Sequence, residues 1–183
     1  LVLSTVVPQQ NFLGIVLDDS RSMQVTDLDT QARSRFVVEQ LGTPDSPLRS
    51  ALADRFALRF FKFSSGLDRL TEIGDLTFDG TRTQLGQALE RSAAELTGVP
   101  LSGLVLVTDG ADNSQAAITE PLLALRASAV PVFTVGLGRE ELERDIQLSR
   151  VETPRTALEG AALVVDVVVA QQGYAGETVS VQV

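Results

Sequence analysis

Over its first 143 residues the chain alternates between unbroken apolar runs and amphipathic stretches. The apolar runs are short and contain few polar positions, which is typical of strands that are buried on both faces of a parallel sheet. We expect such strands at Phe12–Leu17, Phe56–Phe63, Leu104–Val107 and Val132–Val135, and a short edge strand at Leu76–Phe78.

Between these runs, apolar residues recur at the spacing of a helix. The clearest case is Thr83–Leu96, which has one apolar stripe and is followed by Gly98. Shorter helices are expected at 34–41, 47–52 and 119–125. Regular alternation of strand and helix predicts an α/β domain over residues 1–143, with a doubly wound, mostly parallel sheet flanked by helices.

The pattern changes from residue 144 onward. In residues 163–169 and 179–183, valines recur at every second position, which is the period of a β-strand. The glycine-containing segment 172–176 predicts a turn between the two strands. We interpret residues 144–183 as the beginning of an antiparallel, β-sandwich-like domain that is truncated. Because a few strands cannot bury an apolar face by themselves, we expect this tail to self-associate into a homodimer.

The amino-acid composition limits the kinds of binding and catalytic site that the chain can form. The 183 residues include 15 Lys and Arg against 24 Asp and Glu, and this net charge of −9 argues against binding to nucleic acid. Cysteine and histidine are both absent, which excludes disulfides, thiolate or imidazole metal sites and a Ser-His-Asp triad. The chemistry left is that of carboxylates and hydroxyls, the ligands of Mg²⁺, Ca²⁺ and Mn²⁺.

Membrane spans are not expected, since no apolar run reaches the roughly 18 residues that a spanning helix needs. The chain begins at Leu1, which favours a processed or excised piece of a longer protein.

Five oxygen-bearing side chains stand where the predicted sheet would bring them together. Asp18, Ser20 and Ser22 follow the first strand, Thr83 opens the long helix, and Asp109 follows a later strand. In a doubly wound sheet these points share the carboxyl edge, where such sheets place ligands. Five oxygens plus water suit an octahedral cation. Since only two of them are charged, the cation would keep a position for water or an incoming carboxylate.

The segments that carry these residues resemble a von Willebrand factor A-type (VWA) domain with its metal-ion-dependent adhesion site, D-x-S-x-S…T…D. They read Asp18-Asp19-Ser20-Arg21-Ser22-Met23, Thr83-Gln84-Leu85-Gly86-Gln87-Ala88-Leu89 and Val107-Thr108-Asp109-Gly110. The resemblance spans about residues 9–138. It implies a divalent cation, Mg²⁺ first and Ca²⁺ or Mn²⁺ as alternatives, held by Asp18, Ser20, Ser22, Thr83 and Asp109.

The resemblance also implies what the site does. Domains of this kind are non-enzymatic modules whose metal coordinates an acidic residue, Asp or Glu, of a partner protein. One position departs from the common pattern, because Arg21 replaces the glycine that many members have between the two serines. More loosely, an α/β unit followed by a β tail resembles the VWA segment of large bacterial membrane-anchored proteins. That implies an extracytoplasmic location for a fragment that does not itself contact the membrane.

Other interpretations of the same residues remain open. Singly, each of the five has an ordinary role as a strand end, loop hydroxyl, helix cap or turn residue. Asp19 is expected to be a solvated neighbour, and Asp112 and Asn113 loop residues. A Mg²⁺-dependent hydrolase or phosphotransfer domain would use the same carboxylates, but it has no evident general base unless Asp19 serves.

Overall fold

The computed structural model describes residues 11–26, 31–114, 118–138, 145–154, 156 and 162–178. The chain divides into two compact units, Leu1–Gly138 and Arg139–Val183, which are described separately. Over the described residues, the structure contains no helix with the length and apolar character needed to cross a membrane.

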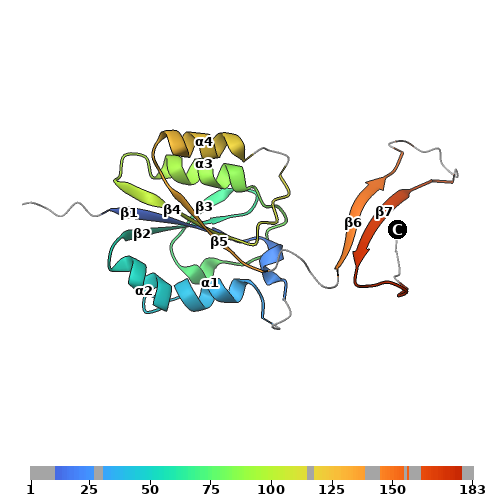
Figure 1. Ribbon diagram of the computed structural model, residues 1–183, viewed down its shortest axis with the longest axis horizontal. Coiled ribbons are helices and arrows are strands. Elements are labelled where there is room, and N and C mark those ends of the chain that lie inside the picture. The colour runs from blue at the N-terminus through green and yellow to red at the C-terminus, as the bar shows by residue number, and fades with distance from the viewer. Residues whose placement is uncertain are drawn as a thin grey trace, which may run out of the picture. The chain divides into compact units, whose positions relative to one another are not determined.

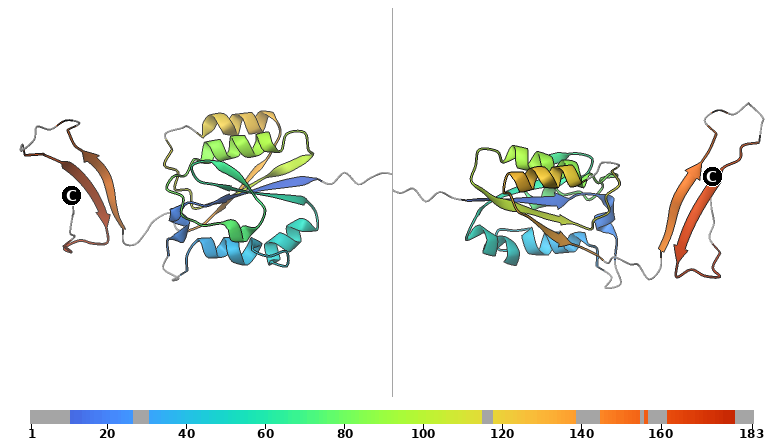
Figure 2. Two further views of the ribbon diagram at one scale, coloured as in Figure 1. Left: turned by 180° about the vertical axis from the view of Figure 1, so that it is seen from behind. Right: turned by 45° about the horizontal axis from the view of Figure 1, so that its top comes forward.

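The first unit is a five-stranded sheet between two layers of helices (Figures 1 and 2). In spatial order its strands are β3 (Leu67–Leu70), β2 (Ala57–Phe63), β1 (Phe12–Asp18), β4 (Leu101–Thr108) and β5 (Val132–Gly136). All pairs are parallel except β2 with β3. This confirms the doubly wound, mostly parallel α/β fold.

Helices cover both faces of this sheet. One face carries α1 (Ser34–Leu41) and α2 (Pro47–Ala53), and the other carries α3 (Leu85–Glu95) and α4 (Thr119–Ala127). Two short 3₁₀ segments, η1 (Arg21–Gln24) and η2 (Ile73–Asp75), lie in the connections.

The core has two halves because side chains alternate along β1. Ile15 and Leu17 pack with Val37 and Leu41 of α1, whereas Val16 packs on the opposite side of the sheet. The side chains that pack with Val16 include Leu85 and Leu89 of α3 and Leu125 of α4. Because β1 is also the central strand of the sheet, its carboxyl end, and Asp18 with it, lies in the middle of the sheet's carboxyl edge.

The edge strand expected at Leu76–Phe78 is wrong. The structure places the edge strand β3 earlier, at Leu67–Leu70, and follows it with η2. The backbone N–H groups of Thr77 and Phe78 donate to the Asp19 carboxylate, and Phe78 has a φ of 51°, so this segment cannot extend the sheet.

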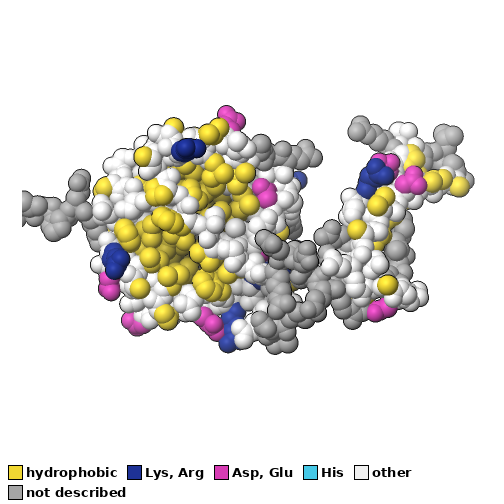
Figure 3. All heavy atoms as spheres, viewed as in Figure 1, with side chains coloured by type: hydrophobic (Ala, Val, Ile, Leu, Met, Phe, Trp, Pro, Cys, Tyr) yellow, Lys and Arg dark blue, Asp and Glu magenta, His cyan; other side chains and the backbone are white. Residues whose placement is uncertain are grey.

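The opposite edge of the sheet, β5, is less covered than the other strands. Phe133, the second residue of β5, is 56% exposed, and Leu122 and Leu123 of α4 are also exposed. Figure 3 shows apolar side chains gathered on one face of this unit.

The second unit contains an antiparallel pair, β6 (Asp145–Glu152) and β7 (Asp166–Gln172). The register places Leu148 opposite Val169 and Val151 opposite Val167, so these four side chains share one face. The strand expected at residues 179–183 lies outside the described residues. The partner of β7 is β6, whose apolar alternation is interrupted by a register irregularity between Leu148 and Arg150 and is therefore not evident in the sequence.

Candidate metal centre

Asp18 is the last residue of β1, and the register of β1 with β4 brings it beside Thr108. Its side chain is fully buried. Oδ1 accepts a hydrogen bond of 2.9 Å from the Ser20 N–H, and Oδ2 accepts one of 2.6 Å from the Thr108 hydroxyl. Burial raises the pKa of the Asp18 carboxyl, the two hydrogen-bond partners lower it, and the nearby charge of Asp109 raises it further; the net direction is upward.

Ser20 and Ser22 turn their hydroxyls toward each other, with 2.8 Å between the two Oγ atoms. The backbone of this loop is fixed by the segment around Gly80. The Arg21 N–H donates to the Gly80 carbonyl at 2.8 Å, and the Gly80 N–H donates to the Asp19 carbonyl at 3.1 Å. A Cβ at Gly80 would lie 2.5 Å from the Cβ of Ser64 and 3.0 Å from that carbonyl, so the close approach of these segments needs glycine there.

Thr83 is buried two residues before α3 begins, so it precedes the helix rather than opening it. Its N–H donates to Asn113 Oδ1 at 2.9 Å, and its carbonyl accepts from the Asn113 N–H at 3.3 Å. Asn113 therefore joins the loop after β4 to the start of α3. Sequence analysis assigned Asn113 to the loop but did not find this role.

Asp109 follows β4, and its side chain is fully buried. Oδ2 accepts a hydrogen bond of 2.7 Å from Nη1 of Arg33, and Oδ1 accepts one of 3.0 Å from the Ala111 N–H. Sequence analysis did not find Arg33. The arginine is 76 residues away in sequence and belongs to no motif, so only the folded chain reveals the contact.

Three of the five predicted residues line one cavity of about 410 Å³ at this edge of the sheet. Its lining residues are Ser20, Arg21, Ser22, Gly80, Thr81, Thr83, Ala111, Asp112 and Asn113. Asp18 and Asp109 do not line it, but the charge of Asp109 acts on Asp18, so the two carboxylates lie near each other. A larger cavity, of about 590 Å³ and lined by residues of α2, β2 and β3, contains none of the predicted site residues.

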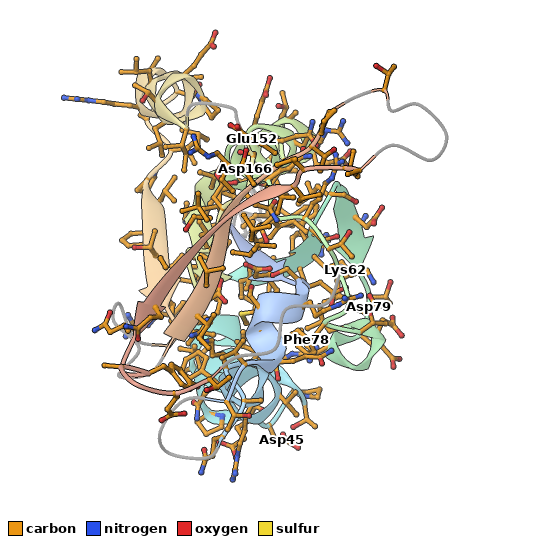
Figure 4. The ribbon with its side chains drawn as sticks, turned by 90° about the vertical axis from the view of Figure 1, so that its right-hand side faces the viewer. Asp45, Lys62, Phe78, Asp79, Glu152 and Asp166 are labelled. Carbon is orange, nitrogen blue, oxygen red and sulfur yellow. The ribbon has the colours of Figure 1, made fainter. Side chains whose placement is uncertain are left out.

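Asp19 is not the solvated neighbour that the sequence suggested. It is buried, its Oδ1 accepts from the N–H groups of Thr77 and Phe78, and its Oδ2 lies 3.3 Å from Nζ of Lys62. Figure 4 looks onto this end of the molecule, with Lys62, Phe78 and Asp79 labelled. The carboxylate of Asp19 therefore fastens the segment after η2 to the end of β1.

No protein-family model and no curated protein matches this chain. Solved structures do match. One is proximal thread matrix protein 1 from the mussel byssus, with 22% identity, a TM-score of 0.51, and coverage of 69% of this chain and 38% of that one. Another structure of that protein, described as having a zinc-occupied MIDAS motif, matches with 20% identity and the same coverage and TM-score.

A third match is manganese-loaded TRAP protein of Plasmodium vivax, with 19% identity, a TM-score of 0.50, and coverage of 72% of this chain and 58% of that one. These neighbours contain VWA domains. The chain has the VWA fold. It spans less than two thirds of each neighbour, so the likeness concerns this domain and not the whole of those proteins.

The residues at this edge of the sheet fit a hard divalent cation. At the edge where β1 and β4 end, Asp18 lies near Asp109, the Ser20 and Ser22 hydroxyls contact each other, and Thr83 lines the same cavity as the two serines. All five side chains offer oxygen, the donor that such a cation prefers. Within the described residues, no three acidic, histidine or cysteine side chains form a cluster. Any cation at this edge would therefore depend on neutral hydroxyls as well as on Asp18 and Asp109.

Proposed function

We propose that this VWA domain is a divalent-cation-dependent protein-binding module. The cation, Mg²⁺ first and Ca²⁺ or Mn²⁺ as alternatives, is held by Asp18, Ser20, Ser22, Thr83 and Asp109, and it binds an Asp or Glu side chain of a partner protein. What supports the proposal is that three segments distant in sequence bring these residues to one edge of the sheet, with Ser20, Ser22 and Thr83 on one cavity and Asp18 near Asp109. The zinc and manganese described for the two neighbours support the choice of a divalent cation.

The composition of the site explains why the cation would bind a ligand rather than remain a closed structural ion. Only two of the five donors carry a negative charge, and the three hydroxyls are neutral. The ion would therefore stay electrophilic and favour an anionic oxygen in a remaining position. The cavity bounded by Ser20, Ser22 and Thr83 gives a partner's carboxylate access from solvent.

Charge around this cavity favours an acidic partner. Arg21 is exposed and lines the cavity beside Ser20 and Ser22, so its guanidinium can pair with the carboxylate that approaches the cation. With its net charge of −9, the chain as a whole does not suit a nucleic acid.

The alternative, a Mg²⁺-dependent hydrolase or phosphotransfer domain, loses support from Asp19. A general base must be able to reach the proton that it removes. Both oxygens of Asp19 are engaged, one by two backbone N–H groups and one by Lys62. We therefore propose that the domain is not an enzyme.

Manganese tests the proposal in two steps. Mn²⁺ binding to the full chain is measured by electron paramagnetic resonance, and water proton relaxation by the bound Mn²⁺ is then followed as acetate is added. We expect binding that is lost in Ser22→Ala, and a relaxation that falls when acetate replaces bound water. Absence of binding contradicts the metal site. Steady turnover of p-nitrophenyl phosphate with Mg²⁺ would support the enzyme instead.

The arrangement of the parent protein is a further part of the proposal. We infer that residues 1–143 are the binding module and that residues 144–183 begin a β-sandwich-like domain, since the described pair β6 and β7 has one apolar face. The larger protein would be membrane-anchored and bacterial, with this module on the extracytoplasmic side.

A further inference from the structure

The guanidinium of Arg33 contacts one carboxylate of the candidate metal centre, that of Asp109. Its Nη1 donates to Asp109 Oδ2 at 2.7 Å, and only 10% of the arginine side chain is exposed. The guanidinium thus sets a positive charge of the protein's own against one of the two carboxylates that would hold a divalent metal.

The position of Arg33 is fixed by several parts of the fold. Its N–H donates to the Val25 carbonyl at 3.2 Å, which ties it to the end of η1 and hence to the loop of Ser20 and Ser22. Gly138 has a φ of +87°, and a side chain there would overlap the guanidinium, so glycine leaves room for it. The arginine is thus held at its backbone by Val25 and at its guanidinium by Asp109.

The partners of the two carboxylates differ in kind. Asp18 accepts from the Ser20 N–H and the Thr108 hydroxyl, which are neutral donors, whereas Asp109 accepts from a guanidinium and the Ala111 N–H. A divalent cation that reaches Asp109 meets the positive charge of Arg33 at short range, and the low-dielectric surroundings strengthen that repulsion. Without a metal, the same charge relieves the repulsion between Asp18 and Asp109.

We propose that Arg33 is a built-in counter-ion of Asp109, which stabilises the metal-free domain and lowers its affinity for divalent cations. This inference rests on the proposed function, because it assumes that Asp109 helps to hold the metal. Arg33 would then set the metal affinity of the site, which would be lower than the five oxygen donors would give without the arginine.

Two variants of the full chain test this inference. Arg33→Gln removes the charge and keeps a polar side chain, while Arg33→Lys keeps the charge. Arg35→Gln is the matched control, because Arg35 also lies at the start of α1 but pairs with Glu39 in an exposed position. Mg²⁺ and Mn²⁺ dissociation constants are measured by titration calorimetry, and unfolding temperatures by scanning calorimetry with and without the metal.

We expect Arg33→Gln to bind both cations about tenfold more tightly than the unchanged chain. Its unfolding temperature should be lower without metal and should rise more when metal is added. Arg33→Lys and Arg35→Gln should keep a dissociation constant close to that of the unchanged chain. If Arg33→Gln folds only when metal is present, the counter-ion role is supported, since the metal then replaces the missing charge.

Several results would overturn the inference. If the unchanged chain binds metal and Arg33→Gln binds it equally or more weakly, Arg33 does not compete with the cation, while the proposed function stands. If Arg33→Gln stays unfolded even with metal, the arginine is a structural residue that a cation cannot replace. If neither chain binds metal, both the inference and the proposed function fail.

Discussion

Thr83 and Asn113 hold each other by two hydrogen bonds, one of 2.9 Å from the Thr83 N–H to Asn113 Oδ1 and one of 3.3 Å from the Asn113 N–H to the Thr83 carbonyl. The loop after β4 is thereby fastened to the residue that precedes α3. The position of the Thr83 hydroxyl then depends on a side chain 30 residues away.

Asn113→Ala should therefore weaken metal binding without removing a ligand. Losing the acceptor for the Thr83 N–H should lower the free energy of unfolding by about 1 kcal/mol and raise the Mn²⁺ dissociation constant several-fold. Asn113→Asp keeps an acceptor oxygen, so its free energy of unfolding and its Mn²⁺ dissociation constant should both be closer to those of the unchanged chain. Paramagnetic resonance titrations of the two variants check this. Equal metal binding by Asn113→Ala would show that the contact does not position Thr83.

Asp18→Asn should stabilise the metal-free domain at neutral pH and abolish metal binding. Burial and the charge of Asp109 raise the pKa of the Asp18 carboxyl in the folded state, so the folded chain holds this proton more tightly than the unfolded chain. Stability therefore falls as pH rises from the unfolded pKa through the raised folded pKa, and the cost of the buried charge is complete above it. The amide carries no such cost.

The difference in unfolding free energy between Asp18→Asn and the unchanged chain should therefore shrink as the pH is lowered through that window. Urea unfolding of both proteins in chelator, over a series of pH values, measures it. A difference that stays constant with pH would mean that folding does not raise the pKa of the Asp18 carboxyl.

Asp109→Asn should act in the opposite direction on stability. The carboxylate is paired with a largely buried guanidinium, so its loss leaves Arg33 with a weaker partner. We expect the free energy of unfolding to fall by about 1–3 kcal/mol and metal binding to be lost, with the fold retained. Circular dichroism and calorimetry check the two effects. A more stable metal-free Asp109→Asn would contradict the pairing with Arg33.

Asp19→Ala should lower stability through the segment that it fastens. Two backbone N–H groups, of Thr77 and Phe78, would lose their acceptor, and Lys62 would lose its partner. The expected loss is about 2 kcal/mol, with Mn²⁺ still bound by the folded protein. Thermal unfolding with and without Mn²⁺ separates the two properties. Loss of metal binding from a folded Asp19→Ala would make Asp19 part of the metal centre.

The exposed apolar face of the pair β6 and β7 should cause self-association. Leu148 is 62% exposed, and Val151 and Val169 on the same face are also exposed. A two-stranded sheet cannot bury such a face alone. Light scattering should find a dimer of the full chain, and Leu148→Lys should weaken it. Val168→Lys, on the other face, is the matched control. A monomeric full chain would end this proposal.

Much of this fold could be predicted from the sequence because its strands are short, fully apolar runs between amphipathic stretches. Phe12–Leu17 is such a run, and it forms a central strand that is buried on both faces of the sheet. The edge strand was misplaced because its residues, Leu67–Leu70, include two charged side chains and show no apolar run. Leu76–Phe78 looked more like a strand, but the backbone there binds the carboxylate of Asp19.

The position of the candidate site could be predicted together with the sheet. Parallel strands end at the same edge, so Asp18 and Asp109 could be placed there from the strands that they follow. The contacts that hold these side chains could not. The contacts of Arg33 and Asn113 depend on the conformation of loops, which leaves no periodic pattern in the sequence. Both contacts also join residues at least 30 positions apart.

Anomalous scattering from crystals of this chain soaked in Mn²⁺ would locate the cation itself. We predict one manganese peak beside the cavity of Ser20, Ser22 and Thr83, bound directly or through water by Asp18 and Asp109, and absent in Asp18→Asn. No peak at this edge of the sheet at a saturating Mn²⁺ concentration, or a peak held by other residues, would contradict the proposed metal site.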